Sequence, residues 1–156
     1  MKLSELFIRL TSTFFFVGYL PLIPGTFGSL AGIALFYLVK DNILAFSLLA
    51  LGLIILGFLV CGKAEQLIGK KDPKCVVIDE VAGQLLALMC LPYYDTRIII
   101  VGFILFRLFD TLKVFPAGRI QYLKGSLGIM SDDLIAALYT NIILQVVLRS
   151  ACFKTA

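Results

Sequence analysis

Five of the ten acidic residues fall into three small clusters at the ends of apolar stretches. The clusters are Asp79-Glu80, Asp110 with Arg107 and Lys113 on either side, and Asp132-Asp133. Carboxylates grouped without His or Cys favour a hard cation, and Mg²⁺ commonly binds one or two carboxylates together with phosphate oxygens. Arg can hold a phosphate through its planar guanidinium and Lys as a point charge. These residue types therefore point to metal-assisted phosphoryl chemistry.

Each cluster also has an ordinary structural explanation. Asp79-Glu80 would be stabilised by about 0.3–1 kcal/mol as the acidic first turn of a helix. Arg107 and Asp110, three residues apart, would form an ion pair on one helix face. Asp132-Asp133 would complement the dipole of a last helix that Ser131 caps. Acidic residues inside membrane segments are rare and usually functional, which favours a site if the clusters meet in space.

A turn near the N-terminus could supply an anion site. The stretch from Pro24 to Leu30 places small residues and hydroxyls at the start of an apolar helix. Free backbone N–H groups and the positive end of the dipole attract phosphate at such a position. The candidate phosphate-binding residues are Pro24, Gly25, Thr26, Gly28, Ser29, Arg107 and Lys113.

Composition excludes several other chemistries. The chain has 156 residues and no His, so it cannot form a Ser-His-Asp triad, a Cys-His pair or a His-ligated zinc site. Its four Cys show no C-x-x-C spacing, and most lie in or beside apolar runs, where a thiol usually acts as a small hydrophobe. No basic stripe with interleaved aromatic residues is present, so nucleic acid is not an expected partner.

The apolar runs predict the elements that must position these clusters. With 60% hydrophobic residues, 15% charged residues and a mean hydropathy of +1.01, the chain has the composition of a membrane protein. Its length allows one domain, residues 1–156. We expect an all-α membrane bundle of about four to five membrane helices, in which Ile43–Gly62 is the clearest span. The other expected helices are Thr26–Val39, Val76–Tyr94, Ile98–Val114 and Leu134–Leu148.

If the five spans cross the membrane in alternating directions, every unusual polar cluster lies on the same side of the membrane. Residues 1–25, 63–80 and 107–133 then share a side that holds ten of the fourteen Lys and Arg and eight of the ten acidic residues. By the positive-inside rule this side is cytoplasmic. The sequence thus predicts a polar site at the cytoplasmic side of the bundle.

Four sequence blocks closely resemble the phosphatidylglycerophosphatase A family, in the family's order. The blocks are Pro24-Gly25-Thr26-Phe27-Gly28-Ser29-Leu30, Asp79-Glu80-Val81-Ala82-Gly83-Gln84, Phe106-Arg107-Leu108-Phe109-Asp110-Thr111-Leu112-Lys113 and Gly128-Ile129-Met130-Ser131-Asp132-Asp133. Any one block is a weak signal, whereas four in order are specific.

The resemblance implies a Mg²⁺-dependent lipid phosphatase of the bacterial cytoplasmic (inner) membrane. Such an enzyme removes the terminal phosphate of phosphatidylglycerophosphate in the bilayer and yields phosphatidylglycerol, a step of phospholipid biosynthesis. We expect the catalytic and metal-binding residues to be Asp79, Glu80, Asp110, Asp132 and Asp133.

Two alternatives stay open at the level of sequence. The chain could be a non-catalytic small membrane protein, such as a transporter subunit or assembly factor, whose polar clusters are caps and packing contacts. It could also be a phosphatase of another lipid phosphate. Sequence decides neither the oligomeric state, nor the number of metal ions, nor whether water or an aspartate attacks the phosphorus.

Overall fold

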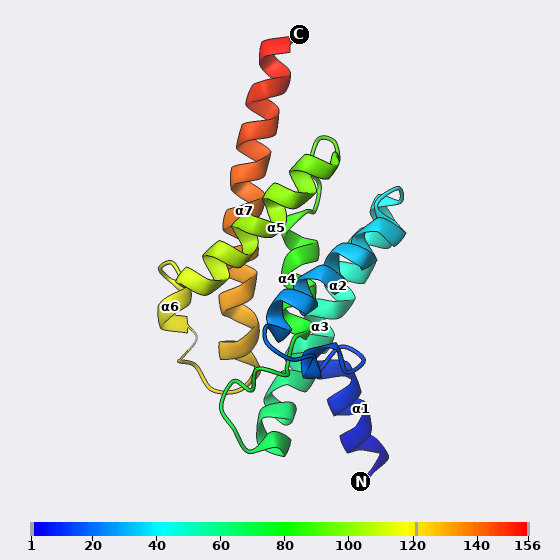
Figure 1. The fold of residues 1–156 in the computed structure, drawn as a ribbon, viewed down its shortest axis with the longest axis vertical. Helices are drawn as coiled ribbons and strands as arrows, with labels where there is room; N and C mark the ends of the chain where they lie inside the picture. Colours follow the sequence, from blue (N-terminus) through cyan, green and yellow to red (C-terminus); the bar gives the residue numbers. More distant parts are fainter. Residues whose placement is uncertain (1, 121, 156) are drawn as a thin grey trace.

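The computed structural model describes residues 2–120 and 122–155, with side chains for 2–120 and 122–150. The described residues form helices and contain no β-strand, which confirms the all-α prediction (Figure 1). In chain order the elements are α1 (Leu3–Ser12), the 3-10 helix η1 (Val17–Tyr19), α2 (Pro24–Val39), α3 (Ile43–Ile68), α4 (Ile78–Ala87), α5 (Thr96–Leu112), α6 (Ala117–Ile120) and α7 (Ser126–Thr155).

The short helix α4 lies at the centre of the bundle (Figure 1). It packs against α2, α3, α5 and α7, and eight of its ten residues are buried. Its apolar side chains, among them Ile78, Val81 and Leu85, are fully enclosed. The helix that begins with Asp79 and Glu80 is therefore surrounded by protein on most sides.

Glycines allow α4 to approach its neighbours closely. Gly32 of α2 faces α4 so directly that a Cβ there would lie 2.9 Å from the carbonyl oxygen of Val81. Gly83 of α4 faces α5, where a Cβ would lie 2.7 Å from the ring of Phe106. No side chain larger than hydrogen fits at either contact without movement, so these glycines set the spacing of the three helices.

Two helices, fewer than the four to five expected, are long and apolar enough to cross a membrane. They are α3 and the Ser126–Ser150 part of α7. Crossing a bilayer takes about 20 apolar residues, whereas α2 and α5 have 16 and 17. Within the expected span Val76–Tyr94, the only α-helix is the ten-residue α4, and its apolar side chains are buried in the protein interior. Composition alone does not distinguish residues that face lipid from residues that face other helices.

The last helix begins earlier than expected. The prediction that Ser131 caps it is wrong, because α7 starts at Ser126 and includes Ser131. Gly125, with φ of +66°, makes the turn into α7, and the Ser126 hydroxyl accepts a hydrogen bond of 2.7 Å from the Gly62 N–H of α3. Asp132 and Asp133 consequently lie one to two turns inside the helix and are buried.

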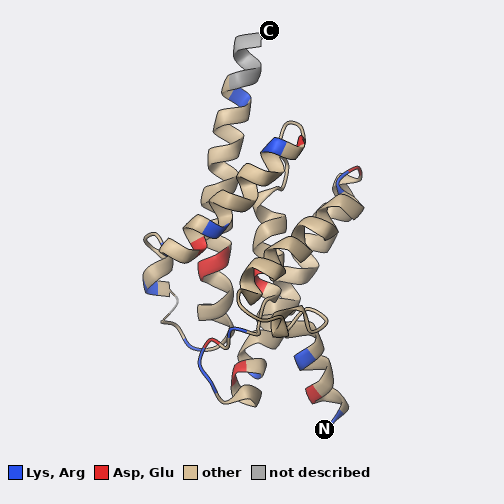
Figure 2. Cartoon of the chain, in the orientation of Figure 1, with Lys and Arg blue, Asp and Glu red and all other residues tan. Residues whose placement is uncertain are grey.

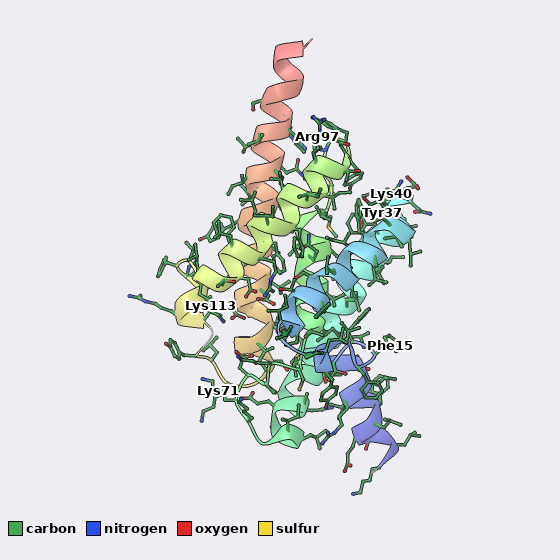
Figure 3. All side chains as sticks on the ribbon, viewed as in Figure 1. Phe15, Tyr37, Lys40, Lys71, Arg97 and Lys113 are labelled. Carbon is green, nitrogen blue, oxygen red and sulfur yellow. The ribbon has the colours of Figure 1, made fainter. Side chains whose placement is uncertain are left out.

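The sequence analysis does not expect α1, which packs against α3. The chain leaves α1 through three consecutive residues with left-handed backbone, Phe14, Phe15 and Phe16. Phe15 is 68% exposed and extends away from the bundle (Figure 3). The Thr13 hydroxyl accepts a hydrogen bond from the Phe16 N–H, which holds this unusual turn.

Candidate active site

The structure brings the two adjacent acids of α4 together with one acid of α7. Oxygen atoms of Asp79, Glu80 and Asp133 all lie within 4.8 Å of one another. Asp79 and Asp133 are buried, and Figure 2 shows the acidic segments of α4, α5 and α7 at a similar height in the bundle. These three residues are 53 or 54 positions apart across the two helices, so the packing of α4 on α7 creates the cluster.

The start of α4 is held in place by the N-terminal part of the chain. The Val77 N–H donates a hydrogen bond of 2.9 Å to the carbonyl oxygen of Ser12, at the end of α1. Gly18 lies so close to Cys75 that a Cβ would come within 2.0 Å of its carbonyl oxygen. The backbone just before Asp79 and Glu80 is thus anchored to α1 and to the turn that follows it.

The remaining two acids are paired with the cations of α5. Arg107 and Asp110 form an ion pair of 2.7 Å on one face of α5, as their spacing predicts. Lys113, which follows α5 (labelled in Figure 3), donates a hydrogen bond to Asp132 of α7. Asp110 also interacts with Asp133, which links these pairs to the three-acid cluster.

Burial and crowding change the proton affinity of the α4 acids. Burial raises the pKa of Glu80 to about 8, a shift that the neighbouring Asp133 and Asp110 increase. Burial and the adjacent Glu80 raise the pKa of Asp79 well above its ordinary value. For Lys113, the hydrogen bond and charge of Asp132 outweigh the effect of burial and raise its pKa. The cluster therefore lacks enough positive charge to keep all its carboxylates ionised.

Several buried oxygen atoms of the site have no protein partner. Within the described part of the chain, Glu80 Oε2 and Asp132 Oδ1 accept no hydrogen bond, and neither polar atom of the Gln84 side chain makes one. A buried carboxylate oxygen without a partner is costly, and a metal ion or an ordered water can satisfy it. The donor set is all oxygen and the local charge is negative, so the residues fit Mg²⁺.

A pocket of about 270 Å³ opens beside Glu80 and Arg107. Three exposed or half-exposed residues at the start of α2 form its apolar rim, and the lining also includes four charged residues. The lining residues are Leu22, Ile23, Pro24, Gly25, Asp72, Lys74, Glu80 and Arg107. The pocket is large enough for a phosphate group. Because Glu80 lines it, a phosphate bound there would lie beside the acidic cluster.

The predicted phosphate turn reaches the pocket only in part. Pro24 and Gly25 line it, and a Cβ at Gly25 would lie 2.2 Å from Glu80 Oε1 and 3.1 Å from the Arg107 guanidinium. Gly28 packs against Val77 and Glu80. Gly28 and the other two residues lie outside the pocket lining. Thr26 is half-buried, and the Ser29 hydroxyl donates a hydrogen bond to the carbonyl oxygen of Gly25. The glycines allow α2 to approach Glu80 closely, whereas the Ser29 hydroxyl is used in a hydrogen bond within α2.

Two charged residues of the pocket are absent from the sequence-based site. Asp72 and Lys74 lie in the loop between α3 and α4, within the segment 63–80 that is expected on the cytoplasmic side. Pro73 between them is buried, and Asp72 has a left-handed φ of +45°. A charged tripeptide centred on proline, a few residues before the acidic pair, is the signal that could have identified them.

Comparison with known proteins finds one matching family and several relatives. The family model described as Phosphatidylglycerophosphatase A matches residues 10–148. A protein of Escherichia coli named Phosphatidylglycerophosphatase A is 33% identical over 121 residues, which cover 76% of this chain and 70% of that protein. The protein of the same name from Haemophilus influenzae is 34% identical over 139 residues, or 87% of this chain and 85% of its own.

A third relative carries a different name. A protein of Bacteroides thetaiotaomicron called putative phosphatidylinositol-3-phosphatase is 33% identical over 154 residues, which cover 94% of this chain and 96% of the relative. No solved structure matches the chain. The family model covers most of the chain, including the α4, α5 and α7 residues of the site, and the protein belongs to the phosphatidylglycerophosphatase A family, a family of lipid phosphatases.

Proposed function

We propose that the protein is a Mg²⁺-dependent phosphatase that removes the terminal phosphomonoester of phosphatidylglycerophosphate and releases phosphatidylglycerol. The observation that supports this most directly is the convergence of Asp79, Glu80 and Asp133 beside a pocket lined by Arg107. The names of two relatives specify this substrate for those relatives.

The metal-binding residues in this proposal are the three clustered acids, Asp79, Glu80 and Asp133, supported by Asp110 and Asp132. When bound, Mg²⁺ supplies positive charge to phosphate oxygens and lowers the pKa of a coordinated water. A bound divalent cation would also offset the repulsion that raises the pKa of Asp79 and Glu80.

The remaining residues bind and orient the phosphate. Arg107 lines the pocket and is held by Asp110, so its guanidinium is oriented before substrate arrives. Gly25 lets the Glu80 carboxylate and the Arg107 guanidinium approach α2 closely, since a Cβ there would lie 2.2 Å from Glu80 Oε1 and 3.1 Å from the guanidinium. Lys113 fixes Asp132 and supplies a second positive charge near the cluster.

A carboxylate of the cluster also has to accept a proton or attack the phosphorus. With water as nucleophile, an unprotonated acid beside the phosphate takes the proton that the water loses. With an aspartate as nucleophile, the enzyme forms an aspartyl phosphate that water then hydrolyses. Acid quenching during turnover of ³²P-labelled substrate separates the two routes, because only the second leaves label on the protein.

The membrane position follows from the apolar helices. In this proposal α3 and the Ser126–Ser150 part of α7 cross the bacterial cytoplasmic membrane, and the pocket faces the cytoplasm. The exposed residues Leu22 and Ile23 at the pocket rim would contact the bilayer, so the acyl chains stay in lipid while the headgroup enters.

Phosphate release from purified protein in detergent tests the function. We expect hydrolysis of phosphatidylglycerophosphate that depends on added Mg²⁺ and is abolished in Asp110→Asn, with the variant still folded by circular dichroism. Absence of release by well-folded wild-type protein with Mg²⁺ present would refute the enzyme proposal and favour a non-catalytic membrane protein.

Phosphatidylinositol 3-phosphate belongs in the same assay as a second candidate substrate. The Bacteroides relative named for that lipid aligns with 94% of this chain at an identity similar to that of the other two relatives. Faster turnover of the inositol lipid than of phosphatidylglycerophosphate would change the substrate assignment and leave the phosphatase assignment intact.

A further inference from the structure

The pocket beside Glu80 changes in polarity from its rim to its interior. Leu22 and Ile23 on the rim are 95% and 55% exposed and carry no polar group. Lys74, also exposed, lines the pocket from the loop between α3 and α4. Arg107 and Glu80 are less exposed and lead to the buried acids. A lipid whose phosphomonoester reaches Arg107 therefore extends the rest of its headgroup toward the exposed residues of the pocket, which include Lys74.

Lys74 is free to bind a ligand at this position. Among the side chains that the structure describes, no carboxylate oxygen lies within 4 Å of Lys74 Nζ, whereas Arg107 and Lys113 are both paired with acids. Its backbone is nevertheless fixed. Pro73 is buried, its carbonyl oxygen accepts a hydrogen bond of 2.8 Å from the Val76 N–H, and the next residue, Val77, is bonded to Ser12.

The substrates named for the relatives share one chemical feature besides the phosphomonoester. Phosphatidylglycerophosphate and phosphatidylinositol 3-phosphate both carry the phosphomonoester on a polyol, and a phosphodiester joins the polyol to the lipid. Along such a headgroup the phosphodiester lies between the acyl chains and the phosphomonoester. With the phosphomonoester at Arg107, the phosphodiester lies toward the exposed part of the pocket, to which Lys74 belongs.

We infer that Lys74 binds the phosphodiester of the headgroup and thereby selects lipids that carry a second phosphate next to the phosphomonoester. This inference rests on the proposed function. It makes Lys74 a specificity residue, one that binds the part of the substrate that does not react. Phosphatidic acid, which has a phosphomonoester and no phosphodiester, makes no such contact.

Steady-state kinetics of Lys74→Gln in mixed micelles test the inference, with phosphatidylglycerophosphate and phosphatidic acid of the same acyl chains as substrates. Because the substitution removes a charge-assisted hydrogen bond to the bound substrate, the KM for phosphatidylglycerophosphate should rise roughly tenfold, with little change in kcat. The preference for phosphatidylglycerophosphate over phosphatidic acid should fall by the same factor. Lys74→Arg should restore most of it, because Arg keeps the charge.

Lys70→Gln is the matched control. Lys70 is an exposed lysine of the same loop that does not line the pocket, so its substitution should leave both KM values unchanged. An unchanged KM in Lys74→Gln, an equal loss on both lipids, or a wild-type enzyme with no preference for phosphatidylglycerophosphate would overturn the role of Lys74. Absence of activity on every lipid tested would refute the proposed function itself.

Discussion

At the scale of single residues, the site is defined by more negative charge than its own cations neutralise. Asp110 and Asp132 each have a basic partner, whereas Asp79, Glu80 and Asp133 face one another with oxygens within 4.8 Å. Like charges buried together oppose folding, and such an arrangement persists where function requires it. Substitution of one of the three acids without a basic partner should therefore affect activity and stability differently.

Asp133→Asn should reduce activity without reducing thermal stability. We expect loss of phosphatase activity by at least about 100-fold, because the proposed metal site exchanges a charged carboxylate for a neutral amide. In Mg²⁺-free buffer the thermal unfolding midpoint should stay equal to that of the wild type or rise, since one of three crowded charges is removed. Asp41→Asn, in the exposed turn before α3, is the control that should change neither quantity. A large fall in the midpoint of Asp133→Asn would show that the carboxylate is mainly structural.

The raised pKa of Glu80 predicts how stability depends on pH without metal. Its pKa is about 8 in the folded protein against an ordinary value of 4.5, so between these values the folded state holds a proton that the unfolded chain has lost. The free energy of unfolding should therefore decrease as pH rises from about 4.5 to about 8. Denaturant titrations across this range in Mg²⁺-free buffer measure the slope.

Two variants and the addition of Mg²⁺ test whether Glu80 causes this pH dependence. Glu80→Gln should flatten it, whereas Glu5→Gln, in the first turn of α1, should retain it. Mg²⁺ should add more stability at the alkaline end, because metal binds the deprotonated carboxylate. Identical slopes in the wild type and Glu80→Gln would contradict the assignment of this titration to Glu80.

At the scale of helices, the contact between α2 and α4 aligns the phosphate turn with the acids. Gly25, Gly28 and Gly32 lie on one face of α2 and meet Glu80, Val77 and Val81 of the α4 region in turn. The same face brings Gly25 to the pocket. The spacing of the two helices and the shape of the site are therefore set by the same row of small residues.

Gly32→Ala tests this contact at a distance from the chemistry. The added methyl would lie 2.9 Å from both the Val81 carbonyl oxygen and the Gln84 Cβ, so α2 must move away from α4. We expect a loss of about 1–3 kcal/mol in the free energy of unfolding, with reduced activity. Gly52→Ala is the matched control, since no heavy atom lies within 4 Å of a Cβ there and alanine favours the helix. Equal stability of the two variants would show that α2 and α4 tolerate a wider spacing.

At the scale of the whole molecule, the long helix α3 separates two charged loops. The loop with Asp72 and Lys74 follows α3, whereas the turn with Lys40 and Asp41 precedes it (Figures 1 and 2). Because α3 is long enough to cross a bilayer, the two loops should lie on opposite sides of the membrane. By the positive-inside rule we expect the loop with Asp72 and Lys74 to lie on the cytoplasmic side.

Single cysteines introduced into a cysteine-free protein measure this topology. A thiol at Lys70→Cys should react with a membrane-impermeant maleimide in inverted vesicles, and a thiol at Asp41→Cys should react in right-side-out vesicles. Both residues are exposed, so neither variant should disturb the fold. Reaction of both thiols from the same side would show that α3 does not cross the membrane.

Sequence by itself determined the helical class, the family resemblance and the identity of the acidic clusters, because these depend on residue type and local spacing. The Arg107–Asp110 pair follows from an i,i+3 relation on one helix, and Ile43–Gly62 is apolar enough to predict α3 without further information. Only the tertiary structure decided which acids meet. Asp133 joins Asp79 and Glu80 because α7 begins at Ser126 and packs on α4, and neither fact is encoded by local pattern.

The number of spans and the role of the α3–α4 loop also required the tertiary structure. A buried helix such as α4 and a lipid-facing helix use the same apolar residues, so hydropathy counts both as spans. In the sequence, Lys74 does not differ from other lysines of a solvated loop. In the structure, hydrogen bonds of the Pro73 and Val77 backbone fix this loop, and Lys74 lines the pocket. Local spacing thus specifies the groups that do chemistry, and long-range packing specifies which of them share one site.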